Sequence, residues 1–327
     1  MARILEANDD SLREAAAILR SGGLVAFPTE TVYGLGANAL DHDAVAGIFS
    51  AKGRPATNPV IVHIANPSLL TDIAETNETA ETLIQNFWPG ALTLVLPKRP
   101  CVPDIVTAGG PTVAVRMPDH PVALRLLVES GLPLAAPSAN RSESLSPTRA
   151  EHVVESLGDY IDLILDGGPC HVGLESTVVD LTCDPPRLLR PGMISPDEIF
   201  KKTGIRISVL PTETSSNEPA RAPGQMTRHY APKTTLVIRR DLRQSLGEFE
   251  GRLGLLFCGD IPSECVFEGS VTHTLPLDPQ AYAEGLYDAL HILDSSNVDV
   301  ILVQEPPKTP AWLAIWDRLT RASAKTS

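Results

Sequence analysis

The 327-residue sequence lacks long hydrophobic runs, and its longest apolar stretches, such as residues 60–64 and 298–303, are short. A helix that crosses a bilayer needs about 18–20 apolar residues, so we predict no membrane span. The N-terminal segment MARILEANDDSLRE reaches acidic residues before any apolar stretch forms, which is unlike a secretory signal. We therefore expect a protein that is not exported.

Cysteine is scarce, and a basic charge excess is absent. The five cysteines are odd in number and form no C-x-x-C pair, which argues against a disulfide framework or a zinc knuckle and fits a reducing cytoplasm. The chain has 27 basic and 40 acidic residues, for a formal net charge of −13. Binding to nucleic acid through many phosphate contacts normally requires the opposite sign. Direct binding to RNA is therefore not expected.

The composition is that of a folded α/β protein with two domains. Hydrophobic residues make up 43% and charged residues 20%, and the length exceeds the roughly 250–300 residues at which a single core stops growing. Residues 1–205 alternate strand-like and helix-like segments. Residues 206–233 are rich in Pro, Ser and Thr and have no periodicity, so we predict a linker there. Residues 234–327 predict a smaller parallel α/β domain.

Hydrophobic patterns locate the elements of both domains. In the first domain, strands are predicted at 24–28, 60–64, 91–96, 112–117, 132–137, 163–166, 176–181 and 187–190. Helices are predicted at 11–21, with Ser11 and Glu14 as a capping box, from Ser146 to Gly158, and after Ser195-Pro196. In the second domain, strands are predicted at 234–238, 253–257 and 298–303, and helices at 279–293 and 310–322.

Several common catalytic motifs are absent, including G-x-x-x-x-G-K-[ST], H-E-x-x-H, G-x-S-x-G and the protein-kinase set. Residues 34–39 (GLGANA) imitate a dinucleotide fingerprint. However, residues 28–33 separate them from the preceding strand, and no acidic residue follows about 20 positions later. A glycine turn that lets the backbone approach a ligand or a neighbour is the favoured interpretation.

Polar side chains gather at strand ends, where open α/β sheets form ligand clefts. The segment PTETVYG leaves the strand at 24–28 with three hydroxyls and one carboxylate. Lys52 and Arg54 place two cations on one loop, which suits phosphate, although a solvated pair is the alternative. His63 and Arg116 each lie in an apolar strand. Arg116 there requires either an anionic ligand or a buried ion pair.

Further polar residues follow the later strands. Ser138 and Asn140 end one strand, and Ser146 is expected either to cap a helix or to place that helix's N-terminus against an anion. Glu175-Ser176 precedes another strand, and Arg190 closes the last. Each has a turn or cap interpretation. Together they indicate a cleft for a polyanionic nucleotide and a small zwitterion.

The motifs PTETVYGLG, KGRPATNPVIVHI, PGALTLVL, VAVRMPDHP, APSANRS, SPT, LESTVVDL and LLRPG, in this order, resemble the YrdC/Sua5 family. The segment APGQMTRHYAPK and the second α/β domain are similar to the longer, Sua5 form. Residues 225–228 depart from the usual pattern, which leaves their role open. The resemblance implies a twisted, open, mixed YrdC-like sheet with helices, followed by a smaller Rossmann-like domain.

The resemblance also implies a nucleotidyltransferase that converts L-threonine, bicarbonate and ATP to threonylcarbamoyl-AMP and diphosphate. By similarity, the residues that bind threonine are Thr31, His63, Arg116, Ala136 and Ser176. Those that bind ATP are Lys52, Arg54, Asn58, Thr112, Ser138, Asn140, Ser146, Arg190 and Tyr230, with Lys52 and Arg54 as the catalytic pair. We expect no protein metal site, and Mg²⁺ held mainly through the ATP phosphates.

The product implied by the resemblance would pass to a complex that transfers threonylcarbamoyl to tRNA, forming N6-threonylcarbamoyladenosine. Two alternatives remain open. One is an RNA-binding or regulatory module, against which the net charge argues. The other is an enzyme that adenylates another carbamoyl group, as in hydrogenase-maturation carbamoyltransferases, although the chain lacks their acylphosphatase and zinc-finger regions. We further predict that residues 206–233 form a lid over the cleft and include Tyr230.

Overall fold

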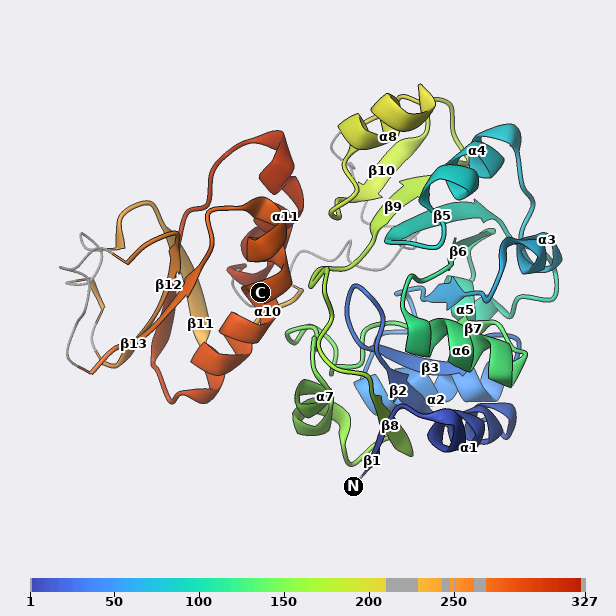
Figure 1. Cartoon of the computed structure of the whole chain (residues 1–327), viewed down its shortest axis with the longest axis horizontal. Helices are drawn as coiled ribbons and strands as arrows, with labels where there is room; N and C mark the ends of the chain where they lie inside the picture. The colour runs from blue at the N-terminus through green and yellow to red at the C-terminus, as the bar shows by residue number, and fades with distance from the viewer. Residues whose placement is uncertain (1, 210–228, 243–247, 250, 262–268, 325–327) are drawn as a thin grey trace.

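The computed structural model describes residues 2–209, 229–242, 248–249, 251–261 and 269–324. Two α/β domains follow one another along the chain, each built on its own sheet (Figure 1). The first sheet is mixed and the second is entirely parallel, so the predicted fold class is confirmed. No helix in the described ranges combines the length and apolar character needed to cross a membrane.

The N-terminal domain contributes ten strands to one sheet in the order β1-β8-β2-β3-β7-β4-β6-β5-β9-β10. The strands are β1 (Arg3–Glu6), β2 (Val25–Phe27), β3 (Gly34–Asn38), β4 (Ile61–His63), β5 (Leu92–Pro97), β6 (Thr112–Arg116), β7 (Leu134–Ala135), β8 (Leu163–Asp166), β9 (Thr177–Asp180) and β10 (Arg187–Arg190). The helices are α1 (Asp9–Arg20), α2 (His42–Lys52), α3 (Leu70–Ile73), α4 (Glu78–Phe87), α5 (Asp104–Thr107), α6 (Pro121–Ser130), α7 (Ala150–Leu157) and α8 (Pro196–Thr203), with a 3-10 turn η1 (Pro67–Leu69).

The C-terminal domain has a four-stranded parallel sheet in the order β11-β14-β12-β13. Its elements are β11 (Thr235–Arg239), β12 (Leu253–Cys258), β13 (Val271–Leu275), α10 (Pro279–Ser295), β14 (Val300–Gln304), the 3-10 turn η4 (Pro310–Trp312) and α11 (Leu313–Ala322). The sequence patterns had predicted all of these except β13. In Figure 1, α10 and α11 lie between this sheet and the N-terminal domain.

Two strands of the large sheet were not predicted. β1 is a short edge strand, parallel to β8, and its largely exposed side chains give no apolar run. β3 occupies the glycine-rich segment interpreted as a turn, and it pairs antiparallel with both β2 and β7. A Cβ at Gly36 would lie 2.7 Å from the Phe27 ring. Glycine is therefore needed here for close packing between strands, and no dinucleotide loop is present.

Two helix starts also differ from prediction. α1 begins at Asp9 because the Asn8 side chain accepts hydrogen bonds from Asp10 N and Ser11 N, both at 3.0 Å. The capping box is thus formed by Asn8 and Ser11, and the predicted Ser11–Glu14 pairing is wrong. α7 begins at Ala150 after Arg149, which makes no side-chain cap. Ser146 therefore does not begin a helix.

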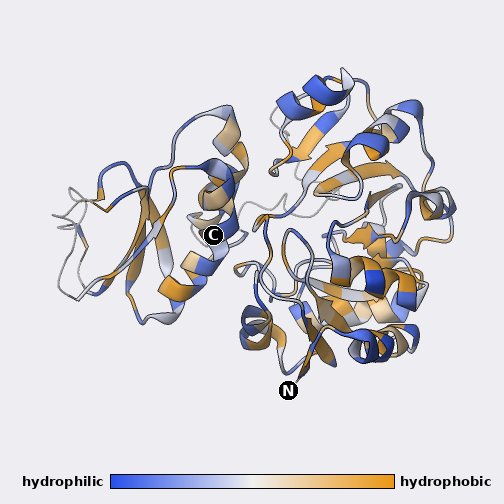
Figure 2. Cartoon of the chain, viewed as in Figure 1, coloured by the Kyte–Doolittle hydropathy of each residue, from blue (hydrophilic) through white to orange (hydrophobic). Residues whose placement is uncertain are grey.

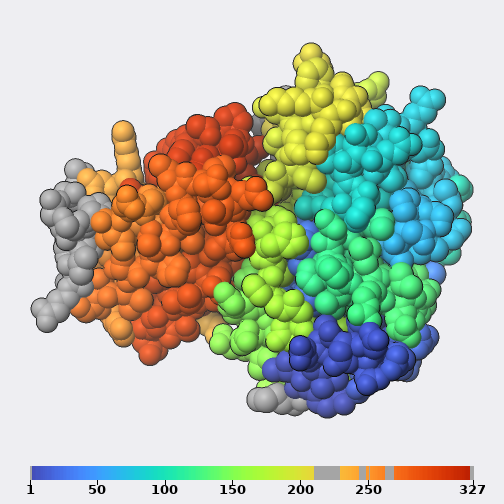
Figure 3. All heavy atoms as spheres, in the orientation of Figure 1, coloured from blue at the N-terminus to red at the C-terminus, as the bar shows by residue number. Residues whose placement is uncertain are grey.

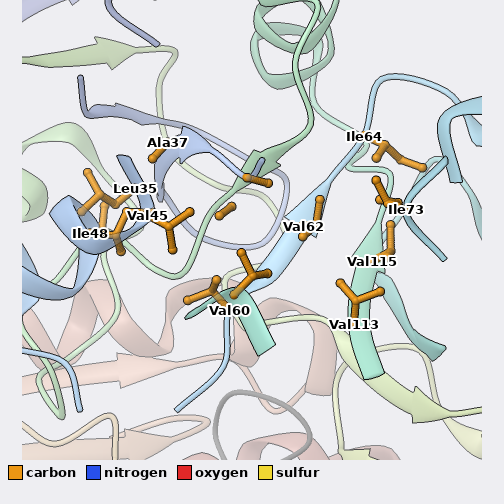
Figure 4. Close-up of a cluster of buried hydrophobic side chains, with 14 of the residues drawn as sticks. Leu35, Ala37, Val45, Ile48, Val60, Val62, Ile64, Ile73, Val113 and Val115 are labelled. Atoms are coloured by element: carbon orange, nitrogen blue, oxygen red, sulfur yellow. The ribbon is translucent and has the colours of Figure 1, made fainter. Parts of the chain in front are cut away.

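The N-terminal domain has a hydrophobic core on each face of its sheet, because Val25 and Phe27 of β2 belong to one cluster of buried side chains and Ala26 to another. Figure 4 shows one of these clusters. Its labelled residues come from β3, α2, α3, β6 and the segment around β4, and they are Leu35, Ala37, Val45, Ile48, Val60, Val62, Ile64, Ile73, Val113 and Val115. Apolar residues concentrate in the strands, while polar residues lie on the outer sides of the helices (Figure 2). This packing fixes the strand ends from which the site is built.

The two domains contact each other directly, as the spheres of Figure 3 show. The His152 ring of α7 stacks on the His291 ring of α10, with centroids 3.8 Å apart. Arg149 donates from Nε to Asp288 Oδ1 at 2.7 Å. The polar face of α10 is therefore an interface with the N-terminal domain.

Candidate active site

A cavity that is partly open to solvent lies at the ends of the central strands of the large sheet. Its walls come from the loop after β2, the ends of β4, β6 and β10, the segment after β7 and the residues just before β9. Nine of the predicted site residues line it: Thr31, Arg54, His63, Arg116, Ala136, Ser138, Ser176, Arg190 and Tyr230. The rule that polar residues at strand ends form a common cleft therefore holds for most of the set.

Register explains how His63 and Arg116 meet. β4 and β6 are parallel neighbours, and these two residues are directly paired as the last of their strands. The Arg116 guanidinium forms an ion pair with Glu30, and it also donates to Thr31 Oγ1 at 2.9 Å and to Gly90 O at 3.1 Å. For Arg116 the sequence left a buried ion pair and contact with an anionic ligand as alternatives. In the structure Arg116 both forms the buried ion pair and lines the cavity.

The loop after β2 is organised by Thr29. Its hydroxyl oxygen accepts hydrogen bonds from Thr31 N and Val32 N at 3.2 Å and donates to Val32 O at 2.6 Å. This closed turn presents Thr31 to Arg116. A guanidinium has five donors, and the three contacts above leave N–H groups of Arg116 for a carboxylate in the cavity.

His63 is a neutral group at this wall of the cavity. Burial and the nearby Arg116 cation lower the pKa of His63 to about 3, so its ring is uncharged at neutral pH. Its Nδ1 atom is buried and has no hydrogen-bond partner within the described structure. A neutral imidazole with an unused ring nitrogen can exchange a hydrogen bond with a small polar ligand.

Cations line another part of the cavity. Arg54 donates from Nε to Asn58 O at 2.9 Å and from Nη2 to Pro59 O at 2.7 Å. Burial lowers its pKa to about 10, a change that Tyr230 opposes and Arg190 supports, so Arg54 remains charged. Arg190 donates from Nε to Ser176 O and from Nη2 to Ser176 Oγ, both at 3.1 Å. Two fixed cations thus line the cavity.

Tyr230 and His229 close the cavity from the segment that follows the undescribed residues 210–228. Tyr230 has a left-handed backbone conformation, with φ of 61°, and its hydroxyl is buried without a hydrogen-bond partner among the described residues. Burial raises the pKa of Tyr230, so the hydroxyl keeps its proton and can donate to a ligand. The predicted lid over 206–233, with residues 225–228, lies mostly outside the described residues and stays a prediction.

Five predicted site residues do not line the cavity. Lys52 is buried, and its ammonium donates to Ser138 O at 2.5 Å and to Asn140 O. Asn140 donates from Nδ2 to Arg141 O and Ser144 O, and Asn58 supplies the carbonyl that Arg54 binds. Lys52, Asn58 and Asn140 are thus placed behind the wall, where they hold the segments that form it.

The other two of these five lie elsewhere. Thr112 is the first residue of β6 and pairs with Pro97, at the opposite end of the strand from Arg116. Ser146 donates from Oγ to Glu175 Oε1 at 2.5 Å, and its carbonyl contacts His291 Nε2 at 3.2 Å. The expectation that Ser146 presents a helix N-terminus to an anion is therefore wrong, because the hydroxyl instead binds a buried carboxylate at the domain interface.

The sequence analysis missed the role of acidic residues at the cavity. Glu175 lines it, and Glu30 lies behind it as the partner of Arg116. Both were visible as isolated acids inside otherwise uncharged motifs, TETVYG and LESTVV, and a single acid in an apolar surrounding is a signal for a buried ion pair. Both carboxylates are occupied by arginines, Glu175 by Arg318.

Comparisons with known proteins agree with this architecture. A family model of the Sua5, YciO and YrdC proteins, described as "Telomere recombination", matches residues 17–192. A second model, "Threonylcarbamoyl-AMP synthase, C-terminal domain", matches residues 194–324.

Individual relatives match nearly the whole chain. The threonylcarbamoyl-AMP synthase of Bacillus subtilis is 45% identical and covers 98% of this chain and 94% of the relative. That of Pyrococcus abyssi is 46% identical and covers 95% and 94%. The crystal structure of P. abyssi Sua5 complexed with L-threonine superposes with a TM-score of 0.90, at 44% identity, covering 98% of each chain. The chain therefore belongs to the Sua5/YciO/YrdC family and has the two-domain organisation of its Sua5 members.

Proposed function

We propose that this protein is a threonylcarbamoyl-AMP synthase that joins L-threonine, bicarbonate and ATP with release of diphosphate. The observation that carries the proposal is that Thr31, His63 and Arg116 line the same cavity as Arg54 and Arg190. One part of the cavity suits the carboxylate and hydroxyl of an amino acid, and another suits phosphates. The relatives named as synthases and the relative solved with L-threonine support this assignment.

The chain's contribution to the reaction is mainly positioning and charge neutralisation. The threonine amine takes up CO₂ derived from bicarbonate and becomes a carbamate, whose oxygen attacks the α-phosphorus as diphosphate leaves. Arg116 holds the amino-acid carboxylate, and Arg54 and Arg190 face the phosphates. Fixed cations aimed at charge that develops during displacement are the largest available source of rate enhancement in such a site. Lys52 acts by fixing the segment that carries Ser138.

Mg²⁺ enters this proposal as part of the ATP substrate. Glu30 and Glu175 are each paired with an arginine, and the described part of the chain contains no group of three or more His, Cys, Asp or Glu residues suited to a metal. A Mg²⁺ ion bound by phosphates and water is compatible with such a site. We also propose a cytoplasmic location and transfer of the product to a tRNA-modifying complex.

Product analysis tests the proposal directly. The purified protein is incubated with ATP, Mg²⁺, L-threonine and ¹³C-bicarbonate, and the mixture is analysed by mass spectrometry. We expect labelled threonylcarbamoyl-AMP and an equivalent amount of diphosphate, both dependent on threonine. Diphosphate release that is equally fast without threonine would contradict the proposal, and a labelled adenylate of another carbamoyl donor would reassign the substrate.

A further inference from the structure

A buried arginine of the C-terminal domain reaches the wall of the cavity from behind. Arg318 on α11 has only 1% of its side chain exposed. Its Nε donates to Glu175 Oε2 at 2.7 Å, and its Nη2 contacts the Glu175 carbonyl oxygen at 3.4 Å. We propose that Arg318 is a positioning residue for nucleotide binding, which neutralises Glu175 and supports the ring of Tyr230.

The second contact of Arg318 is with Tyr230. The guanidinium carbon lies 4.8 Å from the centroid of the Tyr230 ring, a distance at which a cation is attracted to an aromatic face. Tyr287 of α10 lies on the same ring at a centroid distance of 6.1 Å. Glu175 and Tyr230 both line the cavity, so one cation outside the cavity contacts two residues of its wall.

The surroundings of Glu175 keep it ionised. Its carboxylate accepts hydrogen bonds from Ser146 Oγ at 2.5 Å and from Tyr287 Oη at 3.1 Å. Burial by itself raises the pKa of Glu175, but Arg318, then Arg190 and the Ser146 hydroxyl, lower it to about 2. The other titratable groups facing this site are His229 and Tyr230 beside the cavity and Asp317 on α11. Of the two cations that act on Glu175, Arg318 has the larger effect and Arg190 the smaller.

The location of Glu175 makes that neutralisation relevant to ATP. Without Arg318, a buried negative charge would face the space in which the proposed function places a triphosphate, and like charges at a binding surface weaken binding. Both Arg318 and Tyr287 belong to the C-terminal domain, whereas Glu175 belongs to the N-terminal domain. Docking of the second domain therefore influences the charge of a cavity that is formed mainly by the first domain.

A matched control is available at the same interface. Arg149 and Asp288 also form an ion pair between the domains, at 2.7 Å, but the Arg149 side chain is 46% exposed and neither residue lines the cavity. Losing this pair weakens domain contact without adding charge to the cavity. Arg149→Met and Arg318→Met thus separate a structural effect from an electrostatic one.

The kinetic experiment, which rests on the proposed function, measures kcat and KM for the full-length variants at pH 8. We expect Arg318→Met to raise KM for ATP by about 10- to 100-fold, the range for a buried charge that loses its partner, and to raise KM for threonine less. Arg149→Met should leave both unchanged. The double variant Glu175→Gln/Arg318→Met should recover most of the ATP affinity. Equal effects of Arg318→Met and Arg149→Met, or no recovery, would overturn the proposal.

The pH dependence gives a readout that a packing role would not affect. In Arg318→Met the pKa of Glu175 rises because its main cation is lost, so lowering the pH from 8 to 6 should partly protonate Glu175 and reduce KM for ATP. The double variant, which cannot titrate at position 175, corrects for titration of ATP itself. Identical pH profiles for the single and double variants would contradict the electrostatic role.

A measurement without turnover separates this proposal from the proposed function. Ala231 N donates to Glu143 O at 2.8 Å, so amide exchange of Ala231 reports how firmly the Tyr230 segment is held. Faster exchange in Arg318→Met, but not in Arg149→Met, is expected even if the wild-type protein makes no adenylate. If Arg318→Met does not fold, Arg318→Lys serves instead, because it keeps the charge but loses the planar fork. Wild-type exchange in the folded variant would overturn the positioning role.

Discussion

At Gly173 the backbones of the two domains approach each other closely, and changing this residue tests how domain docking affects the site. Its φ is +76°, and a Cβ atom there would lie 2.4 Å from Ala283 O and 2.5 Å from Glu284 Cα on α10. Atoms cannot approach so closely, so Gly173→Ala must displace α10 or the loop by roughly half an ångström or more. Glu175, two residues later, would then lose alignment with Arg318 and Tyr287.

The loss of folding free energy that we expect for Gly173→Ala has two parts. An alanine in a left-handed conformation costs about 1–2 kcal/mol, and overpacking a close contact adds about 1–3 kcal/mol. Gly168→Ala supplies the matched control, because Gly168 has φ of +82° and nothing lies within 4 Å of the added Cβ. The difference between the two variants therefore isolates the clash with α10.

Urea unfolding and steady-state kinetics measure this difference. We expect Gly168→Ala to lose only the backbone part of the free energy of unfolding and to keep its KM for ATP. Gly173→Ala should lose more stability and should also raise KM for ATP. If both variants lose the same stability and bind ATP alike, the domain contact at Gly173 has no influence on the cavity, and the reasoning is refuted.

Three further predictions address the cavity itself. Arg54→Ala should lower kcat by about 10²–10³ with a folded circular-dichroism spectrum, because it removes a fixed cation that lines the cavity. Lys52→Ala should also lower kcat strongly, because it releases the segment that carries Ser138. A variant with near wild-type kcat would show that its residue is not needed for turnover. If residues 206–233 form a lid, Tyr230→Ala should weaken ATP binding measured by calorimetry, and adding ATP with threonine should slow proteolysis within 206–233. Unchanged affinity together with unchanged cleavage would refute the prediction of a lid. Because the folded-state pKa of His63 is lowered to about 3 and its unfolded value is about 6.5, protons bind the unfolded state preferentially as pH falls below 6.5. His63 should therefore cost about 2 kcal/mol of stability between pH 7 and pH 5, and urea unfolding of His63→Asn should show a smaller loss.

Most strands could be predicted because their apolar and β-branched runs reflect burial on both faces of a covered sheet. β3 could not be, because its sequence GLGAN has low strand propensity. The strand forms because β2 and β7 supply hydrogen-bonding partners on both sides, and because Gly36 leaves room for the Phe27 ring. Tertiary contacts thus overrode a local preference for a turn.

The site could be predicted where strand ends determined it. His63 and Arg116 meet because the two parallel strands that carry them end at the same edge of the sheet. Lys52 shows the limit of this approach. It is the last residue of α2, its side chain is buried, and Gly53, with φ of 60°, ends the helix after it. The sequence places Lys52 beside Arg54, but local pattern does not say which of the two cations faces the cavity.

The ion pair between Glu175 and Arg318 could not be predicted, because the local sequence around each residue suggests an ordinary role that needs no partner in the other domain. Glu175 looks like a turn residue before a strand, and Arg318 looks like a solvated charge on an amphipathic helix. They are 143 residues apart. The polar residues Tyr287, Asp288 and His291 of α10 similarly suggest a solvent-facing side, yet each contacts the N-terminal domain. The polar side of an amphipathic helix can therefore be a second interface. In α10 this becomes visible only from the position of the N-terminal domain.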